Sequence, residues 1–188
     1  LTFTATTLLM LRYLPDYPAP DHLRLTWQKF NRVWHKALPV WLSLFLFQAA
    51  NMALNAYILS IGQREGLSLT FASEVVGIAN WVSLLGALFV IWFAHRFNRH
   101  LLFTIGLAIG VVGNLAFLRS DLVTIFVLAN MVTATVWSFC VPYFFGYIAI
   151  LDPSGQLATV SGVASKLGLA TGPLVAAILL GAHDFDYL

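Results

Sequence analysis

Long apolar stretches, separated by loops of a few polar residues, organise nearly the whole chain. Four of them cover residues 37–61, 70–94, 101–118 and 122–151, and a fifth, rich in glycine, covers residues 157–180. An α-helix rises about 1.5 Å per residue, so about 20 apolar residues cross the hydrocarbon core of a bilayer. Stretches of this length predict membrane spans rather than the core helices of a soluble domain. We therefore expect an all-α, polytopic transmembrane bundle of five helices over residues 37–180.

The composition agrees with a membrane protein and argues against several other classes. Hydrophobic residues make up 60% of the chain and charged residues 10%, whereas a soluble domain carries about 25% charged residues. The single cysteine, Cys140, leaves no basis for a disulfide framework. The sequence contains no metal-ligand cluster, no nucleotide-binding glycine loop and no catalytic triad signature. We expect no enzyme activity, no cofactor, no metal and no nucleic-acid partner.

The two ends of the chain predict an internal fragment of a larger protein. Residues 1–12 are apolar but about half a span long, with no basic region typical of a signal peptide, and suit the end of a helix whose start is missing. Residues 13–36 are expected to form a cytoplasmic linker. Residues 181–188 are expected to form a polar extracytoplasmic loop, with a final helix missing.

Basic residues predict which loops face the cytoplasm, because inner loops of membrane proteins are enriched in lysine and arginine. The long first loop and the loop after the second full span hold Arg12, Arg24, Lys29, Arg32, Lys36, Arg96 and Arg99. The opposite side holds Arg64 and Arg119, each close to an acid. This distribution predicts that residues 13–36 lie inside. We expect an integral, multi-pass protein of the bacterial inner (plasma) membrane.

The long first loop contains an amphipathic pattern. Leu23, Trp27, Phe30 and Trp34 recur at helical spacing, and most of the basic residues lie off that stripe. The pattern predicts a helix lying at the inner membrane interface. Such a helix could be regulatory or partner-binding, or a plain connector. We favour the connector, because membrane physics alone explains it.

The loop after the second full span reads Ala94-His95-Arg96-Phe97-Asn98-Arg99-His100. It resembles the cytoplasmic signature of the major facilitator superfamily, in which an acid, an arginine, any residue, a glycine and two basic residues join paired helices. Arg96 and Arg99 match that pattern, while His95 replaces the acid and Asn98 replaces the glycine. Asparagine is the non-glycine residue best suited to a left-handed turn, so the turn is expected to survive.

Three further segments resemble the same family in order and spacing. Residues 66–68 resemble its outer loop between helices seven and eight, residues 152–156 its inner turn between helices ten and eleven, and residues 168–173 its eleventh helix. The chain then resembles the C-terminal half of such a transporter, from the end of helix six through helix eleven. The resemblance implies a secondary transporter that moves a small solute by alternating access, together with a missing N-terminal half of the same chain. Proton coupling is common in the family, and no residue here demonstrates it.

Amides within the first full span predict a solute-binding face. Gln48, Asn51 and Asn55 lie at i, i+3 and i+7 and form one polar stripe. Polar groups in a span are costly unless they pair or meet water. The alternative is hydrogen bonding between helices, worth about 0.6 to 2 kcal/mol per contact. We favour the cavity interpretation, because three stacked amides exceed what packing usually requires.

Two charged residues fall within or near spans. Lys166 is the one base well inside a span, among small residues. It could bind an anionic solute, or its stem could reach the interface; the sequence leaves both open. Glu74 is a weak candidate for proton coupling. It lies in the first turns of its helix, where the helix dipole favours an acid.

The remaining candidates are aromatic and amide side chains in other spans: Asn80, Trp81, Trp137 and Tyr143. The pairs Gly106-x-x-x-Gly110 and Gly168-x-x-x-Gly172 predict close helix packing. The function expected is therefore solute transport in the lipid bilayer. A membrane enzyme and a non-transporting scaffold or receptor are the alternatives.

Overall fold

The computed structural model describes residues 26–93, 96–152 and 154–182. These residues form helices and turns, and no strand occurs among them. In chain order the helices are α2 (Trp27–Arg64), α3 (Leu69–Val82), α4 (Leu84–Phe93), α5 (Arg99–Ala116), the 3₁₀ helix η2 (Phe117–Arg119), α6 (Val123–Leu151) and α7 (Gln156–Ala182). With α3 and α4 taken together, five helical segments of this described part are long and apolar enough to cross a membrane. The predicted all-α class is confirmed, and so is the prediction of five helices with the length and composition of membrane spans.

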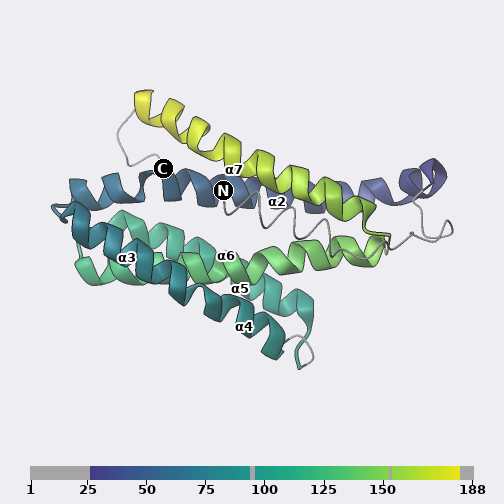
Figure 1. Ribbon diagram of the computed structural model, residues 1–188, viewed down its shortest axis with the longest axis horizontal. Coiled ribbons are helices and arrows are strands. Elements are labelled where there is room, and N and C mark those ends of the chain that lie inside the picture. Colours follow the sequence, from purple (N-terminus) through teal and green to yellow (C-terminus); the bar gives the residue numbers. More distant parts are fainter. Residues whose placement is uncertain (1–25, 94–95, 153, 183–188) are drawn as a thin grey trace, which may run out of the picture.

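The helices are arranged around α6 (Figure 1). Helices α2 and α7 pack side by side, while α3, α4 and α5 pack against α6 in a second group. Helix α6 contacts each of the other described helices, so it is the central element of the bundle. Its buried face includes Phe126, Phe144 and Ile148.

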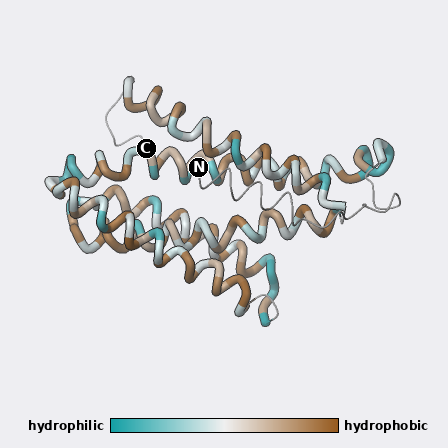
Figure 2. The backbone as a smooth tube through the Cα atoms, viewed as in Figure 1, coloured by the Kyte–Doolittle hydropathy of each residue, from teal (hydrophilic) through white to brown (hydrophobic). Residues whose placement is uncertain are grey.

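The outer faces of the bundle are apolar. Hydrophobic residues cover most of the helix shafts, and the clearest hydrophilic stretches lie at the first turns of α2 and at the start of α5 (Figure 2). Large side chains such as Ile91, Val112 and Ile178 are more than half exposed. An apolar surface this continuous is costly in water and suits contact with lipid. The distribution fits helices that cross a bilayer.

Glycines allow the closest helix contacts. A Cβ added at Gly168 would lie 2.8 Å from the Cβ of Gln48 on α2, and one added at Gly106 would lie 2.8 Å from the Phe139 ring on α6. Both are shorter than van der Waals contact, so only glycine permits these approaches. The prediction that the glycine pairs of α5 and α7 mediate packing is confirmed.

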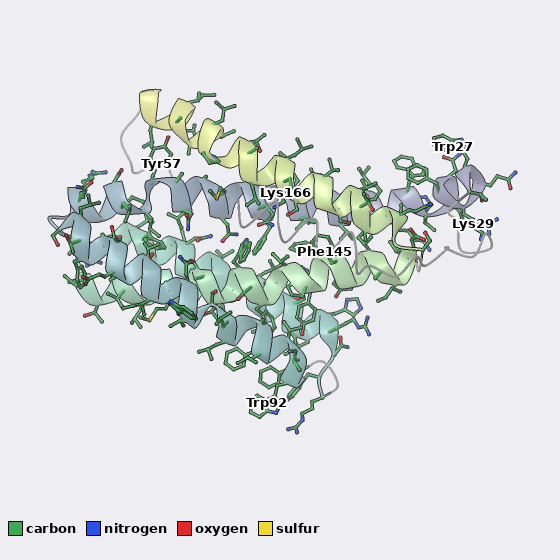
Figure 3. All side chains as sticks on the ribbon, in the orientation of Figure 1. Trp27, Lys29, Tyr57, Trp92, Phe145 and Lys166 are labelled. Atoms are coloured by element: carbon green, nitrogen blue, oxygen red, sulfur yellow. The ribbon has the colours of Figure 1, made fainter. Side chains whose placement is uncertain are left out.

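Helix α2 is longer than a single span. The described part of the expected linker, residues 27–36, belongs to α2, and the helix continues through Pro39 to Arg64. Its 38 residues extend about 57 Å, against about 30 Å for the hydrocarbon core of a bilayer. Trp27 and Lys29 lie at its tip, beyond the ends of the neighbouring helices (Figures 1 and 3). The expected half-span 1–12, linker residues 13–25 and outer loop 183–188 lie outside the described residues.

The second span is broken rather than continuous. Helix α3 ends at Val82 and α4 begins at Leu84, with Ser83 between them. The Ser83 carbonyl oxygen accepts the Gly86 backbone N–H at 2.9 Å and also the hydroxyl of Ser138 from α6. A side chain inserted into the backbone ladder is a recognised cause of helix breaks. The sequence predicted one unbroken helix over residues 70–94, and this contact explains the difference.

Candidate functional site

A cavity of about 210 Å³, called the amide cavity below, lies between α2, α3, α6 and α7. Three of its lining side chains are amides already predicted as candidates, Asn51, Asn55 and Asn80. Its other polar lining residues are Ser83, Asn130 and Thr133. Apolar walls come from residues such as Ile58, Val76 and Leu169. The cavity therefore combines amides and hydroxyls from three helices within a mostly apolar bundle.

Helix α2 contributes two successive amides to the wall. Asn51 is half-buried, and its side-chain N–H donates to the Phe47 carbonyl oxygen of the same helix at 2.8 Å. Asn55 lies one turn further along and is exposed to the cavity side of the bundle. A carboxamide has two donor hydrogens and one acceptor oxygen, so Asn51 keeps hydrogen-bonding capacity beyond its own helix.

Helix α6 presents a matching polar stripe. Asn130 is 3% exposed and donates to the Phe126 carbonyl oxygen at 2.8 Å. Thr133 donates in the same way to the Ala129 carbonyl oxygen at 2.8 Å. Asn130, Thr133 and Trp137 lie at i, i+3 and i+7, which puts them on one helix face. This is the spacing that picked out the amides of α2, so the same rule applied to α6 would have found Thr133.

Gln48 lies behind the cavity wall. Its side chain is 2% exposed. Its oxygen accepts the indole N–H of Trp137 on α6 at 2.7 Å, and its N–H donates to the Ser165 hydroxyl on α7 at 2.7 Å. The polar stripe predicted on α2 is therefore divided. Asn51 and Asn55 line the cavity, whereas Gln48 forms hydrogen bonds to α6 and α7. Trp137 lines the cavity and also donates to Gln48.

The other predicted residues lie away from this cavity. Trp81 is 75% exposed on the outside of the bundle. Tyr143 lines a separate cavity of about 170 Å³ with Arg99 and Tyr147. Glu74 is exposed near the start of α3, which begins after the capping residue Ser68.

Lys166 lies on the flank of α7 that leads to the cavity. Its side chain is exposed and sits near the middle of the helix (Figure 3). Leu169, three residues further on, lines the cavity, and residues three apart share a helix face. Lys166 itself is not among the residues that line the cavity.

The loop motif adopts a different turn from the one expected. Asn98 has φ −65° and ψ 120°, and its side-chain oxygen accepts the His100 backbone N–H at 2.9 Å, so it caps the start of α5. The expectation of a left-handed turn at Asn98 is wrong, because the capping geometry needs extended backbone. Arg99 is the first residue of α5. The Arg96 guanidinium lies 5.8 Å from the Trp92 ring centre at the end of α4, and His95 lies outside the described residues.

The fold and the composition of its helices define an all-α, multi-pass integral membrane protein. Comparison of the sequence with protein-family models and with curated proteins, and of the chain with solved structures, finds no match.

Proposed function

We propose that this chain forms one half of the solute pathway of a secondary active transporter of the major facilitator type. The observation that carries the proposal is the cavity lined by Asn51, Asn55, Asn80 and Asn130 from three spans. Polar groups inside membrane spans are expensive, and they mark substrate pathways when they face a shared cavity. In a transporter of this type, a second bundle of helices would supply the opposing wall.

The cavity chemistry favours a small, polar and uncharged solute. Among the described residues that line it, none carries an ionisable side chain. Amides and hydroxyls exchange hydrogen bonds with neutral polar groups, whereas a charged solute needs an opposite charge to offset its desolvation. The indole of Trp137 adds an apolar surface beside these groups.

The break in the second span supports the same proposal. Ser83 separates α3 from α4 and also lines the cavity. Transporter sites are typically formed near the bilayer midplane by discontinuous helices. A broken helix at the cavity therefore suits a site that must open to each side in turn.

The loop motif at residues 96–99 and the order of the other family-like segments add support from the sequence. Coupling to protons would need a titratable group near the pathway. Glu74 is exposed near the start of α3 and does not line the cavity, and none of the described residues that line it is titratable.

The proposal is tested with the full-length parent protein in liposomes, screened for uptake of neutral polar solutes. For a transported solute, Asn51→Leu and Asn55→Leu should each lower the uptake rate about tenfold, because a hydrogen bond in a desolvated site is worth about 1–3 kcal/mol. Gln63→Leu is the matched control, an exposed amide on the same helix outside the cavity. Unchanged uptake in both Asn51→Leu and Asn55→Leu would contradict the proposal that the cavity binds the solute. Absence of any solute flux would favour a non-transporting scaffold.

A further inference from the structure

A second cavity lies where the cytoplasmic ends of α2, α5 and α6 meet. Its volume is about 630 Å³, and it shares no residue with the amide cavity. Three of its lining residues are basic: Lys36 on α2, and Arg99 and His100 on α5. Tyr147, Ile150 and Leu151 of α6 complete the wall. These helix ends lie towards the right of Figure 1.

The positive charge of this cavity is not offset by its own walls. Among the described residues that line it, none is acidic. The one described acid at the same end of the bundle is Asp152, which is 4% exposed. Its carboxylate oxygens accept hydrogen bonds from the Leu157 and Ser154 backbone N–H groups, at 2.9 Å and 3.0 Å. The cavity therefore attracts anions.

The basic cavity continues into an apolar one. A cavity of about 290 Å³ shares Val40, His100 and Tyr147 with it, and adds Ser43, Phe103 and Phe144 among its lining residues. The Phe103 ring packs against the rings of Phe144 and Tyr147, with centres 4.9 Å and 5.7 Å apart. The two cavities therefore form one groove, with basic residues along one part and aromatic rings along the other.

The neck of the groove carries a hydrogen-bonded pair. The Tyr147 hydroxyl lies 2.8 Å from His100 Nδ1, and both residues line both cavities. The pair thus lies where the basic lining residues meet the aromatic ones. A phospholipid has the same order of parts, with a charged head group next to apolar acyl chains.

We propose that this groove binds one anionic phospholipid of the cytoplasmic leaflet. The phosphate lies between Lys36 and Arg99, and an acyl chain lies along Val40, Phe103 and Phe144. The basic-loop distribution puts this end of the bundle in the cytoplasm, where basic pockets between helices bind anionic head groups. The proposal does not depend on solute transport.

The test is native mass spectrometry of the full-length protein released from bilayers of equimolar phosphatidylglycerol and phosphatidylcholine. One phosphatidylglycerol should remain bound in preference to phosphatidylcholine. Because Lys36 and Arg99 line the groove and would contact the phosphate directly, and because a hydrogen bond to a charged group contributes roughly tenfold in affinity, Lys36→Gln with Arg99→Gln should lower phosphatidylglycerol retention more than tenfold. Arg32→Gln with Arg96→Gln removes the same charge outside the groove and should leave retention unchanged.

A second variant separates the groove from overall charge. Ser43 is exposed and lines the apolar part, so Ser43→Trp should fill that part and displace the lipid at constant charge. Equal retention of the two lipids would overturn the proposal. Equal loss of retention in the Arg32→Gln/Arg96→Gln control, or full retention in Ser43→Trp, would overturn it as well, because either result assigns the binding to diffuse charge attraction. Displacement of the lipid by millimolar inorganic phosphate would also overturn it, because that result assigns the site to a free anion.

Discussion

The indole N–H of Trp137 on α6 donates a 2.7 Å hydrogen bond to the side-chain oxygen of Gln48 on α2. The same Gln48 amide donates to the Ser165 hydroxyl on α7 at 2.7 Å. Trp137 also lines the amide cavity. One buried side chain therefore holds three helices together directly behind the proposed site, and the position of the Trp137 ring depends on it.

Gln48→Leu should destabilise the protein by about 1–4 kcal/mol, because two hydrogen bonds between helices are lost at about 0.6–2 kcal/mol each. The substitution also leaves the Trp137 indole and the Ser165 hydroxyl without this partner. The measurement is unfolding in mixed micelles containing increasing amounts of sodium dodecyl sulfate, followed by circular dichroism. Gln63→Leu, at an exposed position of the same helix, should change stability little. Equal stability of both variants and the parent would contradict the assigned role of Gln48.

The sequence predicts the stripe of amides on α2. It does not predict which amides line the cavity and which form hydrogen bonds to other helices. Spacing alone places Gln48, Asn51 and Asn55 on one face. Whether each side chain meets a cavity or another helix depends on partners from distant segments. Ser165 lies 117 residues from Gln48 along the chain, so no local sequence pattern predicts that hydrogen bond.

Gly172→Ala should force α7 away from α2. A Cβ at Gly172 would overlap the Ala49 carbonyl oxygen and would lie 3.0 Å from the Ala49 carbonyl carbon and from the Ala53 backbone nitrogen. Neither backbone can move without shifting α2. We expect destabilisation by about 1–3 kcal/mol, measured by the same unfolding assay. Gly162→Ala is the matched control on α7, where an added Cβ meets nothing within 4 Å. Gly162→Ala should be neutral or stabilising by up to about 1 kcal/mol. A larger loss in Gly162→Ala than in Gly172→Ala would disprove this packing.

The number of long apolar helices, the limits of the last three and the use of glycine at contacts follow from composition and periodicity, so the sequence predicts them well. The start of α2 at Trp27, ten residues before the predicted 37, is not predicted. The break at Ser83 does not follow from the sequence, since residues 69–93 form one mostly apolar segment in which no local pattern marks Ser83 as a helix end. Its cause is a hydroxyl 55 residues away, on Ser138 of α6. Tertiary contacts of this kind override local helix propensity.

Ser138→Ala should weaken the break between α3 and α4. Without the Ser138 hydroxyl, the Ser83 carbonyl is free to accept the backbone N–H four residues ahead, as in a regular helix. The distance between spin labels at the exposed positions Ile78 and Ile91 should increase, as measured by pulsed electron paramagnetic resonance. Stability should fall by about 0.5–1.5 kcal/mol.

Ser73→Ala provides the control for Ser138→Ala. The Ser73 hydroxyl donates to the Leu69 carbonyl of its own helix at 2.7 Å, so its removal should leave the label distance unchanged. An unchanged distance in Ser138→Ala would show that the break does not depend on the contact with α6.

Asp152 caps the start of α7 from the end of α6. One carboxylate oxygen accepts the Leu157 backbone N–H at 2.9 Å, and the other accepts the Ser154 backbone N–H at 3.0 Å. Burial raises the pKa of this carboxyl, but the hydrogen bonds from Ser154, Leu157 and Gln156 outweigh burial and hold its pKa below the ordinary value. The charged form is thus favoured in the folded protein.

Because the pKa of Asp152 is lower in the folded than in the unfolded state, its contribution to stability is complete above the ordinary aspartate pKa of about 3.9. The contribution is lost as the pH falls through the lower folded pKa. Asp152→Asn removes the charge and one of the two acceptor oxygens, so it should cost about 0.5–2 kcal/mol at pH 7. The difference from the parent should shrink below about pH 4. Asp121→Asn is the control, because the Asp121–Arg119 pair is exposed and contributes about 0–1 kcal/mol. The measurement is the free energy of unfolding from pH 3 to pH 8. If the free-energy difference between Asp152→Asn and the parent is constant over this range, the capping role of the charged carboxylate is contradicted.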